Sequence, residues 1–529
     1  MIKNIFLSII TGFLLAIGWP TYGMPLFLFI GFVPLLLVEY RIRKSNTPKT
    51  NGKVFLSAFI AFSIFNFSTT YWIIYATPFG MFFANIANAL LMSFVFLSYH
   101  IIAKKITQKL SLVFLICLWI GFEKFHLNWE FSWPWLNLGN GFADYHKWIQ
   151  WYEYTGVFGG TFWIWLVNII VYKAFIKLYS SDKTQFIKRI LMAFSLVVIG
   201  IFSSIYIYYT LDESHEKTSV IVVQPNIDSY SEKYTLSNKI MVDKLIRLTE
   251  KKIDSTTSFI ITPETYLSTP RLLNTFRSSP EYKLLNNFRN KYNSLAIVSG
   301  ITFIKRYSEN VKPNKTANFY RDREQWYNSF NAAFFLYKKD TFDFYHKSKL
   351  VVGVEHIPYR SLLNPILKNN MIDLGGSTST LTPQKERSIF KNGKNSLAPI
   401  ICYESVYGEF VTEYVKKGAD FLAIITNDGW WNTSQGHKQH LSIAKLRAIE
   451  TRRSIARAAN TGVSALINQK GDILQALPYG QMGTLKGKIS TSTKQSYYTI
   501  HGDYIYRISM FVLIIILVSS FTKRRQKPV

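Results

Sequence analysis

The sequence predicts a two-part fold, in which a membrane bundle of about eight transmembrane helices is joined to an α/β domain. Three observations lead to this expectation. Apolar runs of spanning length gather before residue 211, short β-rich runs alternate with helical patterns after it, and basic residues favour one side of the apolar runs. A chain of 529 residues is long enough for more than one domain.

Seven apolar runs precede residue 211, and an eighth ends near residue 521. A spanning helix needs about 17–25 predominantly apolar residues. The run at 110–126 is the weakest, because its uninterrupted apolar stretch is short. The first run is not expected to be only a signal peptide, because a second run follows at once without a small-residue cleavage site. The seven runs lie at roughly 2–19, 23–39, 54–75, 81–103, 110–126, 157–179 and 188–210.

The net charge of +29 is compatible with nucleic acid or with an anionic membrane surface as partner. No nucleic-acid-binding motif appears, so no nucleic-acid partner is expected. With the N-terminus inside, the inside segments carry 18 Lys and Arg residues and the short outside loops carry 2. This bias predicts a transmembrane domain at 1–210, an exported domain at 211–504, and a last span with a basic cytoplasmic tail at 505–529.

The outside loop at 124–156 is rich in tryptophan, whose amphipathic ring favours the headgroup level of a bilayer. An interfacial anchor is therefore the first interpretation of this loop, and part of a lipid entry path is the second. The tryptophans are Trp129, Trp133, Trp135, Trp148 and Trp151.

The exported segment reads as strands alternating with helices, which is typical of an α/β fold with helices covering the sheets. Helical patterns lie at 237–253 and 440–459. Residues 305–325 are expected to form a solvated charged loop, and the long loop at 364–397, with Gly375 and Gly376, is expected to be a lid. The β-rich runs are 218–226, 257–265, 295–303, 331–337, 397–405, 419–428 and 462–471.

Three of these strands end abruptly in polar residues, where sites collect in α/β folds. Glu264 follows one strand, Cys402 another, and Asn427 a third. Cys402 is a candidate nucleophile, with an inert buried thiol as the alternative. Glu264 is a candidate base, because burial at a strand end is expected to raise its pKa toward the working range, although a cap or surface glutamate would look the same. Cys117 lies in an apolar run and is expected to be a buried hydrophobe with no disulfide to Cys402.

A lysine beside a thiolate would stabilise the anion and then a tetrahedral oxyanion. Lys347 is one candidate, and Lys349 is its local rival. Tyr403 adjoins the cysteine, while Glu355 and Glu404 are supporting carboxylates that are as easily structural as functional. His437 and His440 have a metal-like spacing, but neither a third ligand nor a H-E-x-x-H pattern accompanies them, so no metal is expected.

The order Glu, Lys, Cys in separate strand-end motifs resembles the nitrilase superfamily. Its fusion to seven preceding spans and one following span is similar to the apolipoprotein N-acyltransferase family. ITPET at Glu264 and ICYE at Cys402 look like the family's glutamate and nucleophile motifs. The family's lysine precedes a Leu-Val by three residues and a second glutamate by eight. Lys347 reproduces this spacing with Leu350-Val351 and Glu355, so the resemblance selects Lys347 over Lys349. LVVGVE stands where the family usually has LVPFGE, which alters the loop around Glu355. Further family-like blocks are TNDGWW at 426–431, GHKQH at 436–440, RAIE at 447–450 and RAANTG at 457–462.

The resemblance implies a nitrilase-like αββα sandwich, held outside the inner membrane of a bacterium in the periplasm. It implies transfer of an acyl chain from a phospholipid to the cysteine as a thioester, and then to the amino group of a diacylglyceryl-cysteine lipoprotein. Glu264 would be the proton acceptor, Lys347 the oxyanion stabiliser and Cys402 the nucleophile, with Asn427, Glu355, Tyr403 and Glu404 in support. Neither a metal nor another cofactor is needed for this chemistry.

Two alternatives stay open at this point. The same three residues suit a membrane-tethered amidohydrolase in which water is the acceptor, and the exported domain of a transport or receptor protein would only bind a ligand. Trp430, Trp431 and Tyr234 are candidates for gating the lipid.

Overall fold

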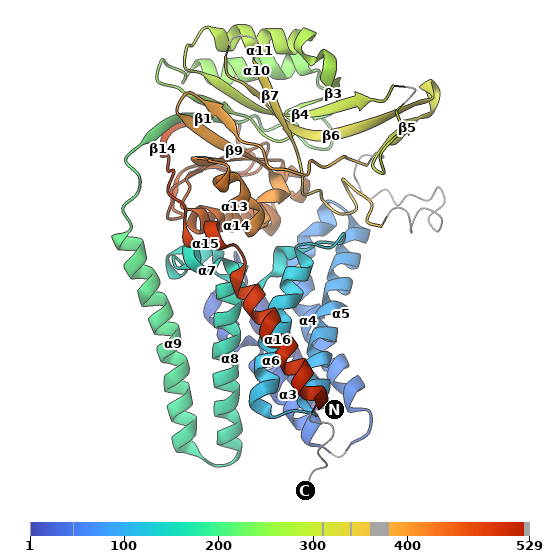
Figure 1. The fold of residues 1–529 in the computed structure, drawn as a ribbon, viewed down its shortest axis with the longest axis vertical. Coiled ribbons are helices and arrows are strands. Elements are labelled where there is room, and N and C mark those ends of the chain that lie inside the picture. Colours follow the sequence, from blue (N-terminus) through green and yellow to red (C-terminus); the bar gives the residue numbers. More distant parts are fainter. Residues whose placement is uncertain (1, 46, 309–310, 339–340, 360–379, 523–529) are drawn as a thin grey trace. The chain divides into compact units, whose positions relative to one another are not determined.

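The computed structural model describes residues 2–45, 47–308, 311–338, 341–359 and 380–522. The chain divides into two compact units (Figure 1). We call residues 1–211 together with 501–529 the membrane unit, and residues 212–500 the sandwich unit.

The membrane unit is built from long apolar helices whose starts are set by caps and prolines. Thr77 caps α5 by accepting from the Gly80 N–H, and Asp182 caps α9 by accepting from the Gln185 N–H. The main helices are α1 (Ile2–Ile17), α3 (Val33–Lys44), α4 (Thr50–Thr70), α5 (Pro78–Ala103), α6 (Gln108–His126), α8 (Val157–Tyr179), α9 (Lys183–Thr210) and α16 (Tyr504–Thr522).

Among the described residues, five helical stretches are long and apolar enough to cross a membrane. Ile2–Ile17 and Tyr504–Ser520 are apolar but shorter, and α6 carries Lys109, Glu123 and Lys124. The expected total of eight crossings is therefore not confirmed. The five stretches are Pro25–Lys44, Thr50–Tyr75, Pro78–Ala103, Val157–Tyr179 and Lys183–Thr210.

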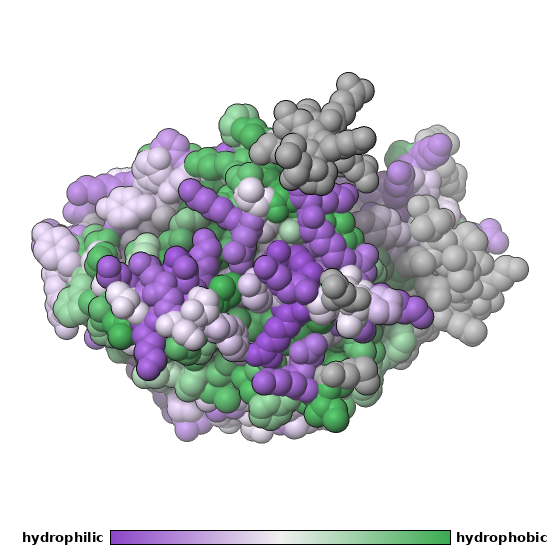
Figure 2. All heavy atoms as spheres, turned by 90° about the horizontal axis from the view of Figure 1, so that it is seen from below, coloured by the Kyte–Doolittle hydropathy of each residue, from purple (hydrophilic) through white to green (hydrophobic). Residues whose placement is uncertain are grey.

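Hydrophilic side chains gather on the end of the membrane unit that holds the turn between α8 and α9, with hydrophobic side chains around them (Figure 2). Basic residues lie in the last turns of α3 and α8, namely Arg41, Arg43, Lys44 and Lys177. Basic side chains at a helix end favour the anionic headgroup region of a bilayer.

The tryptophan-rich loop is folded rather than extended along a surface. Trp135 is 1% exposed, and its ring lies 5.0 Å from that of Trp72 and 5.8 Å from that of Trp133. The interpretation as an interfacial anchor is wrong for Trp135, because its ring is buried inside the unit against the rings of Trp72 and Trp133. The loop contains two 3₁₀ helices, η3 (Pro134–Leu136) and η4 (Leu138–Trp148).

The sandwich unit holds two sheets. The first has eight strands in the order β14-β1-β2-β4-β6-β5, with β3 beside β4 and β7 beside β6. Its strands are β1 (Lys217–Gln224), β2 (Phe259–Ile261), β3 (Leu267–Leu272), β4 (Ala296–Arg306), β5 (Asn318–Tyr320), β6 (Gln325–Leu336), β7 (Phe342–His346) and β14 (Gly483–Ser490).

The second sheet has six strands in the order β13-β12-β11-β10-β9-β8. Its central strands β9, β10 and β11 are parallel and fully buried apart from the first residue of β9, as expected for strands covered on both faces. The strands are β8 (Phe390–Asn392), β9 (Asn395–Ile401), β10 (Phe421–Thr426), β11 (Ile455–Ala459), β12 (Ser464–Ile467) and β13 (Ile473–Leu477).

The two sheets face each other and helices cover their outer faces, which makes the unit an αββα sandwich (Figure 1). Between the sheets, the Phe259 and Phe421 rings lie 5.3 Å apart and the Phe335 and Phe390 rings 4.8 Å apart. The outer helices are α10 (Asn238–Glu250) and α11 (Pro280–Asn290) on the first sheet, and α13 (Gly408–Lys416) and α14 (Gln435–Thr451) on the second.

Three sequence-based expectations need correction. The helix expected over 440–459 ends at Thr451, because Arg452 takes a left-handed conformation (φ 49°) and Ile455–Ala459 pairs with β10 as a strand. The supposed charged loop at 305–325 contains the end of β4, β5, a 3₁₀ turn and the start of β6. Of the expected lid at 364–397, residues 364–379 lie outside the described residues, and the rest contains β8 and the start of β9.

Candidate active site

Strand ends bring the predicted site residues to one edge of the sandwich. Ile401 pairs with Ile425 in parallel register, so Cys402 lies beside the end of β10 and near Asn427. In the facing sheet, Glu264 follows β2. The two edges meet where the Asn427 backbone N–H donates to Glu264 Oε2 at 3.1 Å.

Two carboxylates share one buried lysine at this edge. Lys347 Nζ donates to Glu264 Oε1 and to Glu355 Oε1, each at 2.9 Å. Asn331 Nδ2 donates to the same two oxygens, at 2.7 Å and 2.9 Å. Glu355 Oε2 accepts from the Val351 N–H at 2.8 Å, so the LVVGVE loop holds Glu355 against the lysine despite its unusual sequence.

The pKa of Glu264 moves in the direction opposite to the one expected from the sequence. Burial acts to raise this pKa, but the ammonium groups of Lys347 and Lys233, with hydrogen bonds from Lys347 and Asn331, outweigh burial and bring the pKa below its ordinary value. The expectation of a raised pKa is therefore wrong. Glu264 is a carboxylate at neutral pH and is ready to accept a proton.

Lys347 is the lysine of the site, and Lys349 is not. Lys347 is 1% exposed; burial acts to lower its pKa, but the charges of Glu264 and Glu355 outweigh burial and raise the pKa well above its ordinary value. Its side chain is therefore a fixed cation. Lys349 instead places its Nζ over the Tyr407 ring, 4.8 Å from the ring centre.

Cys402 lies at the first residue after β9 in a left-handed conformation, with φ of 51°. Non-glycine residues in this region are strained and cluster at functional sites. Its side chain is 8% exposed. Burial raises the pKa of the thiol, and the Glu264 and Asp428 carboxylates raise it further, while Lys347 and a hydrogen bond with Thr426 lower it. The resting thiol is therefore protonated and needs a base.

Glu404 joins the strand before the cysteine to the segment that carries the lysine. Its Oε2 accepts from the Ile401 N–H at 2.8 Å, and its Oε1 accepts from the Ser348 N–H at 2.6 Å and from the Tyr345 hydroxyl at 2.7 Å. Burial raises the pKa of Glu404, against the opposing effect of these hydrogen bonds. Glu404 thus fixes Cys402 and Lys347 relative to each other.

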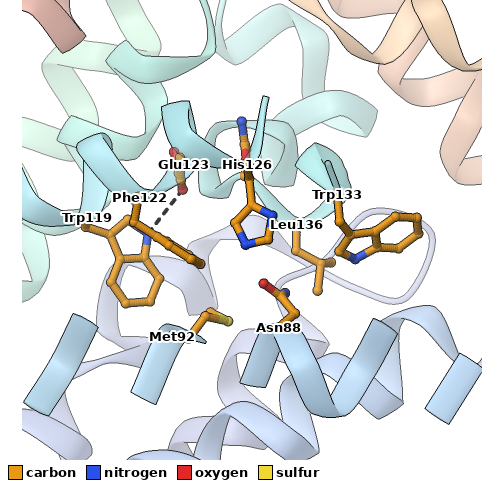
Figure 3. Close-up of a pocket in the computed structure, with 9 residues that line it drawn as sticks. Asn88, Met92, Trp119, Phe122, Glu123, His126, Trp133 and Leu136 are labelled. Atoms are coloured by element: carbon orange, nitrogen blue, oxygen red, sulfur yellow. Dashed lines mark hydrogen bonds between the residues drawn. The ribbon is translucent and has the colours of Figure 1, made fainter. Parts of the chain in front are cut away.

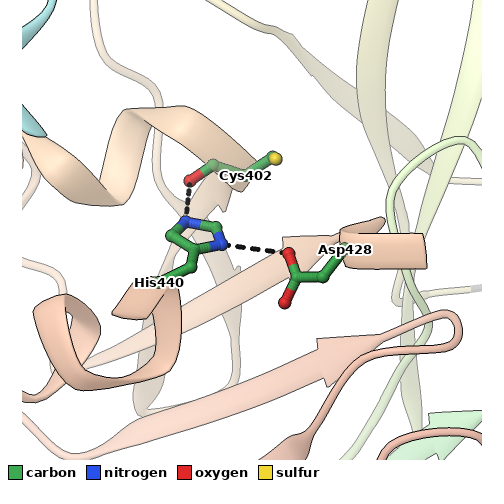
Figure 4. Close-up of side chains that lie close together, drawn as sticks. All are labelled: Cys402, Asp428 and His440. Atoms are coloured by element: carbon green, nitrogen blue, oxygen red, sulfur yellow. Dashed lines mark hydrogen bonds and ion pairs between the residues drawn. The ribbon is translucent and has the colours of Figure 1, made fainter. Parts of the chain in front are cut away.

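A buried network behind the cysteine supports its strained turn (Figure 4). The His440 ring lies with Nε2 3.2 Å from the Cys402 carbonyl oxygen and 3.0 Å from Ser405 Oγ. Its Nδ1 lies 3.0 Å from Asp428 Oδ1, and Arg457 donates to the other carboxylate oxygen at 2.5 Å. In Figure 4 the sulfur points away from His440, and the ring nitrogens of His440 instead contact the Cys402 carbonyl oxygen and Asp428.

The same geometry bears on metal binding. Cys402, Asp428 and His440 each place a ligand-type atom within 4.8 Å of the others. The Arg457 guanidinium already neutralises Asp428, and both His440 nitrogens are engaged in hydrogen bonds. A cation there would meet a fixed positive charge, which disfavours a metal. His437, the other histidine of the motif, packs its ring 4.5 Å from that of Tyr479.

Asp428→Asn is expected to lower the free energy of unfolding by about 3–5 kcal/mol, because it leaves the buried Arg457 guanidinium without its carboxylate. Burial acts to raise the pKa of Asp428, but Arg457 and His440 bring it well below its ordinary value. This contribution to stability is therefore present above the ordinary pKa of an aspartate and is lost only as the pH falls through the lower, folded value. Thermal unfolding followed by tryptophan fluorescence measures this loss of stability. The control is Asp322→Asn, because Asp322 is exposed. Equal stability of the two variants would contradict the role of the network.

The remaining predicted residues lie around this centre. Tyr403 is buried, with its ring 5.3 Å from that of Tyr407. Trp430 meets Tyr230 edge to face at 5.0 Å, and Trp431 lies 5.5 Å from the His440 ring. Tyr234 is 62% exposed.

Sequence reasoning missed several members of the site. Asn331, which bridges Glu264 and Glu355, begins a run that reads only as an apolar strand. Lys233 lies in a polar segment after β1 and has no motif of its own. The partners of Asp428 come from α14 and β11, and only the sheet register brings them together.

Gly300 on β4 lets the Glu264 segment approach closely. A Cβ at this position would lie 2.4 Å from the Pro263 carbonyl oxygen and 2.4 Å from the Thr265 nitrogen, so backbone would have to move. Gly300→Ala is expected to displace Glu264 and to lower turnover by about 10²-fold, the effect of roughly 1 Å of misplacement. The control is Gly52→Ala, where a Cβ meets open space; equal turnover of both variants would contradict this account.

A separate cavity lies in the membrane unit, and no residue of the cysteine site lines it (Figure 3). His126 points into it, and neither ring nitrogen makes a hydrogen bond within the described residues. The other lining residues are Asn88, Met92, Trp119, Phe122, Glu123, Trp133, Leu136 and Asn137.

Comparison with known proteins follows the same division of the chain. Residues 11–170 match the family model of the apolipoprotein N-acyltransferase N-terminal domain, and residues 219–498 match that of carbon-nitrogen hydrolase. A Chlorobaculum tepidum protein named apolipoprotein N-acyltransferase is 26% identical over 533 residues, which covers 99% of this chain and 97% of that protein. Proteins of the same name from Haemophilus influenzae (28% identical, 78% and 76% covered) and Geobacter metallireducens (25%, 95% and 92%) are also similar.

Proposed function

Because this chain belongs to the carbon-nitrogen hydrolase family, we propose that it is a cysteine-dependent acyltransferase of lipoprotein maturation. It transfers an acyl chain from a phospholipid to the N-terminal amino group of diacylglyceryl-cysteine apolipoproteins. The observation that carries the proposal is a buried Glu264, Lys347 and Cys402 cluster in the same chain as helices long enough to cross a membrane. The names of the full-length relatives support the same activity.

In the first half-reaction, Cys402 Sγ attacks the ester carbon of the phospholipid while Glu264 takes the thiol proton. The carbonyl oxygen gains negative charge and the Lys347 ammonium stabilises it. The ester C–O bond then breaks, the proton passes from Glu264 to the departing lysophospholipid oxygen, and a thioester on Cys402 remains.

In the second half-reaction, the amino group of the acceptor attacks the thioester carbon and Glu264 takes a proton from that nitrogen. The C–S bond breaks, an amide forms, and the sulfur recovers a proton from Glu264. Glu264 is thus ionised before each attack, which agrees with the direction of its pKa. The route as written uses only side chains and calls on no metal or cofactor.

We further propose that α1, α6 and α16 cross the bilayer together with the five longer stretches, which gives eight crossings. In this proposal the sandwich unit lies in the periplasm, at the outer face of a bacterial inner membrane, and the distribution of basic residues supports this orientation. Both substrates carry acyl chains. A site held near the bilayer avoids extracting them into water, which would cost about 0.8 kcal/mol per exposed CH₂ group.

The acceptor distinguishes this activity from hydrolysis by the same residues. Detergent-solubilised protein is incubated with phospholipid labelled in its acyl chain, with and without a diacylglyceryl-cysteine peptide. We expect the label to appear in amide linkage at the N-terminus of the peptide, and not when the peptide's amino group is acetylated. Release of the label as free fatty acid at the same rate in both reactions, or no reaction with phospholipid, would reject the transferase.

A further inference from the structure

A second buried lysine, Lys233, lies beside the site and takes no part in the proton transfers described above. It is 4% exposed and follows β1 in a folded segment. Its backbone N–H donates to the Asp228 carbonyl at 3.0 Å, and the Ser268 hydroxyl donates to its carbonyl oxygen. These contacts fix the chain and direct the side chain to the Glu264 backbone carbonyl, which lies 3.4 Å from Nζ.

Lys233 also holds the residue that contacts the Glu264 carboxylate. The Asn427 amide is assigned the orientation in which its oxygen accepts from Lys233 Nζ at 2.8 Å and from Trp430 Nε1 at 3.1 Å. In the opposite orientation the Asn427 NH₂ group would face the Lys233 ammonium, and two hydrogen-bond donors would meet. Lys233 therefore holds Glu264 in two ways. It contacts the Glu264 backbone carbonyl directly, and it contacts Asn427, whose backbone N–H donates to Glu264 Oε2.

The charges of Glu264, Glu355 and Lys347 balance only when Lys233 is included. Glu264 and Glu355 bring two negative charges and share the single positive charge of Lys347. Nearby, Asp428 is already paired with Arg457, and the phenol of Tyr234 also faces the two glutamates. The Glu404 carboxyl faces Lys347 as well, and burial raises the pKa of this carboxyl. Without Lys233, the group of Glu264, Glu355 and Lys347 carries one surplus negative charge, which opposes a further anion at Cys402. With Lys233 it is neutral, both before and after the thiol proton moves to Glu264.

We propose that Lys233 is a positioning residue of this site, whose ammonium balances the Glu264 and Glu355 carboxylates and makes a thiolate at Cys402 accessible. The inference rests on the proposed role of Cys402 as nucleophile and adds a second cation to it. Burial lowers the pKa of Lys233 to about 8, and Lys347 lowers it too, against the opposing charges of Glu264 and Cys402. The ammonium is therefore the main form at pH 7.

The test measures the rate at which iodoacetamide alkylates Cys402 in the full-length protein in detergent, with Cys117→Ser to remove the other thiol. Lys233→Met is expected to slow alkylation at pH 7 by about 3- to 10-fold. Each unit by which the thiol pKa rises removes about nine-tenths of the thiolate, and the greater nucleophilicity of a more basic thiolate recovers about threefold. Lys252→Met is the matched control, because Lys252 also donates to a backbone carbonyl, that of Thr484 at 2.6 Å, outside the site.

The charge itself is tested with Lys233→Arg, which is expected to alkylate within about twofold of the parent. Lys233→Gln replaces Lys233→Met if the methionine variant does not fold. In the folded neutral variant, the acidic limb of acyl-enzyme formation is also expected to move to higher pH, because the pKa of Glu264 loses a lowering influence. A purely structural role would change the melting temperature and leave this limb in place.

Two results would overturn the inference: alkylation by the neutral variant at the parent rate, or equal slowing by the neutral and arginine variants. The proposed function can fail separately. If the parent protein forms no acyl-enzyme with phospholipid, the acyltransferase proposal is wrong, while the alkylation rates still decide whether Lys233 controls the thiol.

Discussion

Glu264→Gln is expected to slow the acylation of Cys402 by about 10²- to 10⁴-fold, the usual contribution of a general base. Glutamine keeps the shape of the side chain but cannot take the thiol proton. Since the folded pKa of Glu264 lies below its ordinary value, the wild-type rate should persist as the pH falls to that ordinary value and drop only below it. Single-turnover acylation between pH 4 and 8 measures both effects.

The control for this substitution is Glu281→Gln on α11. Glu281 is also a buried, ion-paired glutamate, 1% exposed and bonded to Arg271, but it belongs to the outer helical layer. Its variant should lose some stability and keep the acylation rate per folded molecule. Comparable rates in the Glu264 and Glu281 variants would show that Glu264 is not the base.

Lys347→Met is expected to have two separable effects. Loss of the ammonium removes oxyanion stabilisation, which is worth about 10²- to 10³-fold in rate. It also leaves the buried Glu264 and the partly buried Glu355 without their shared cation, and breaking a buried ion pair in this way costs about 3–5 kcal/mol of stability. Acylation kinetics and thermal unfolding measure the two losses.

The double variant Lys347→Met with Glu355→Gln separates these effects. Removing one carboxylate relieves part of the unpaired negative charge, so stability should rise above that of the single variant. The rate should stay low, because no cation faces the oxyanion. Recovery of the rate together with stability would mean that Lys347 acts on folding and not on the reaction.

The sequence was sufficient for the parts of this protein that depend on local pattern. The strand ends at Glu264 and Cys402 are recognisable because an apolar run stops at a polar residue, whereas the choice of Lys347 over Lys349 came from the resemblance to the family's lysine motif. The alternation of strands and helices predicted the α/β class, because each element must bury one face.

The parts that were missed depend on contacts between distant segments. The pKa of Glu264 was expected to rise because burial was the only visible influence, whereas Lys233 and Lys347 approach it from other segments. The helix expected beyond Thr451 failed because pairing of Ile455–Ala459 with β10 outweighs its helical pattern. The sequence predicts an interfacial position for Trp135, but its ring packs against Trp72 inside the membrane unit.

The most direct measurement of the central claim is the intact mass of the protein after incubation with phospholipid of a single acyl composition. The account predicts an increase equal to one acyl group in place of one hydrogen, located at Cys402 by fragmentation and removed by neutral hydroxylamine, as a thioester requires. The Cys117→Ser protein should gain the adduct and the Cys402→Ala protein should not. An unmodified Cys402, or an adduct that survives in Cys402→Ala, would contradict the account.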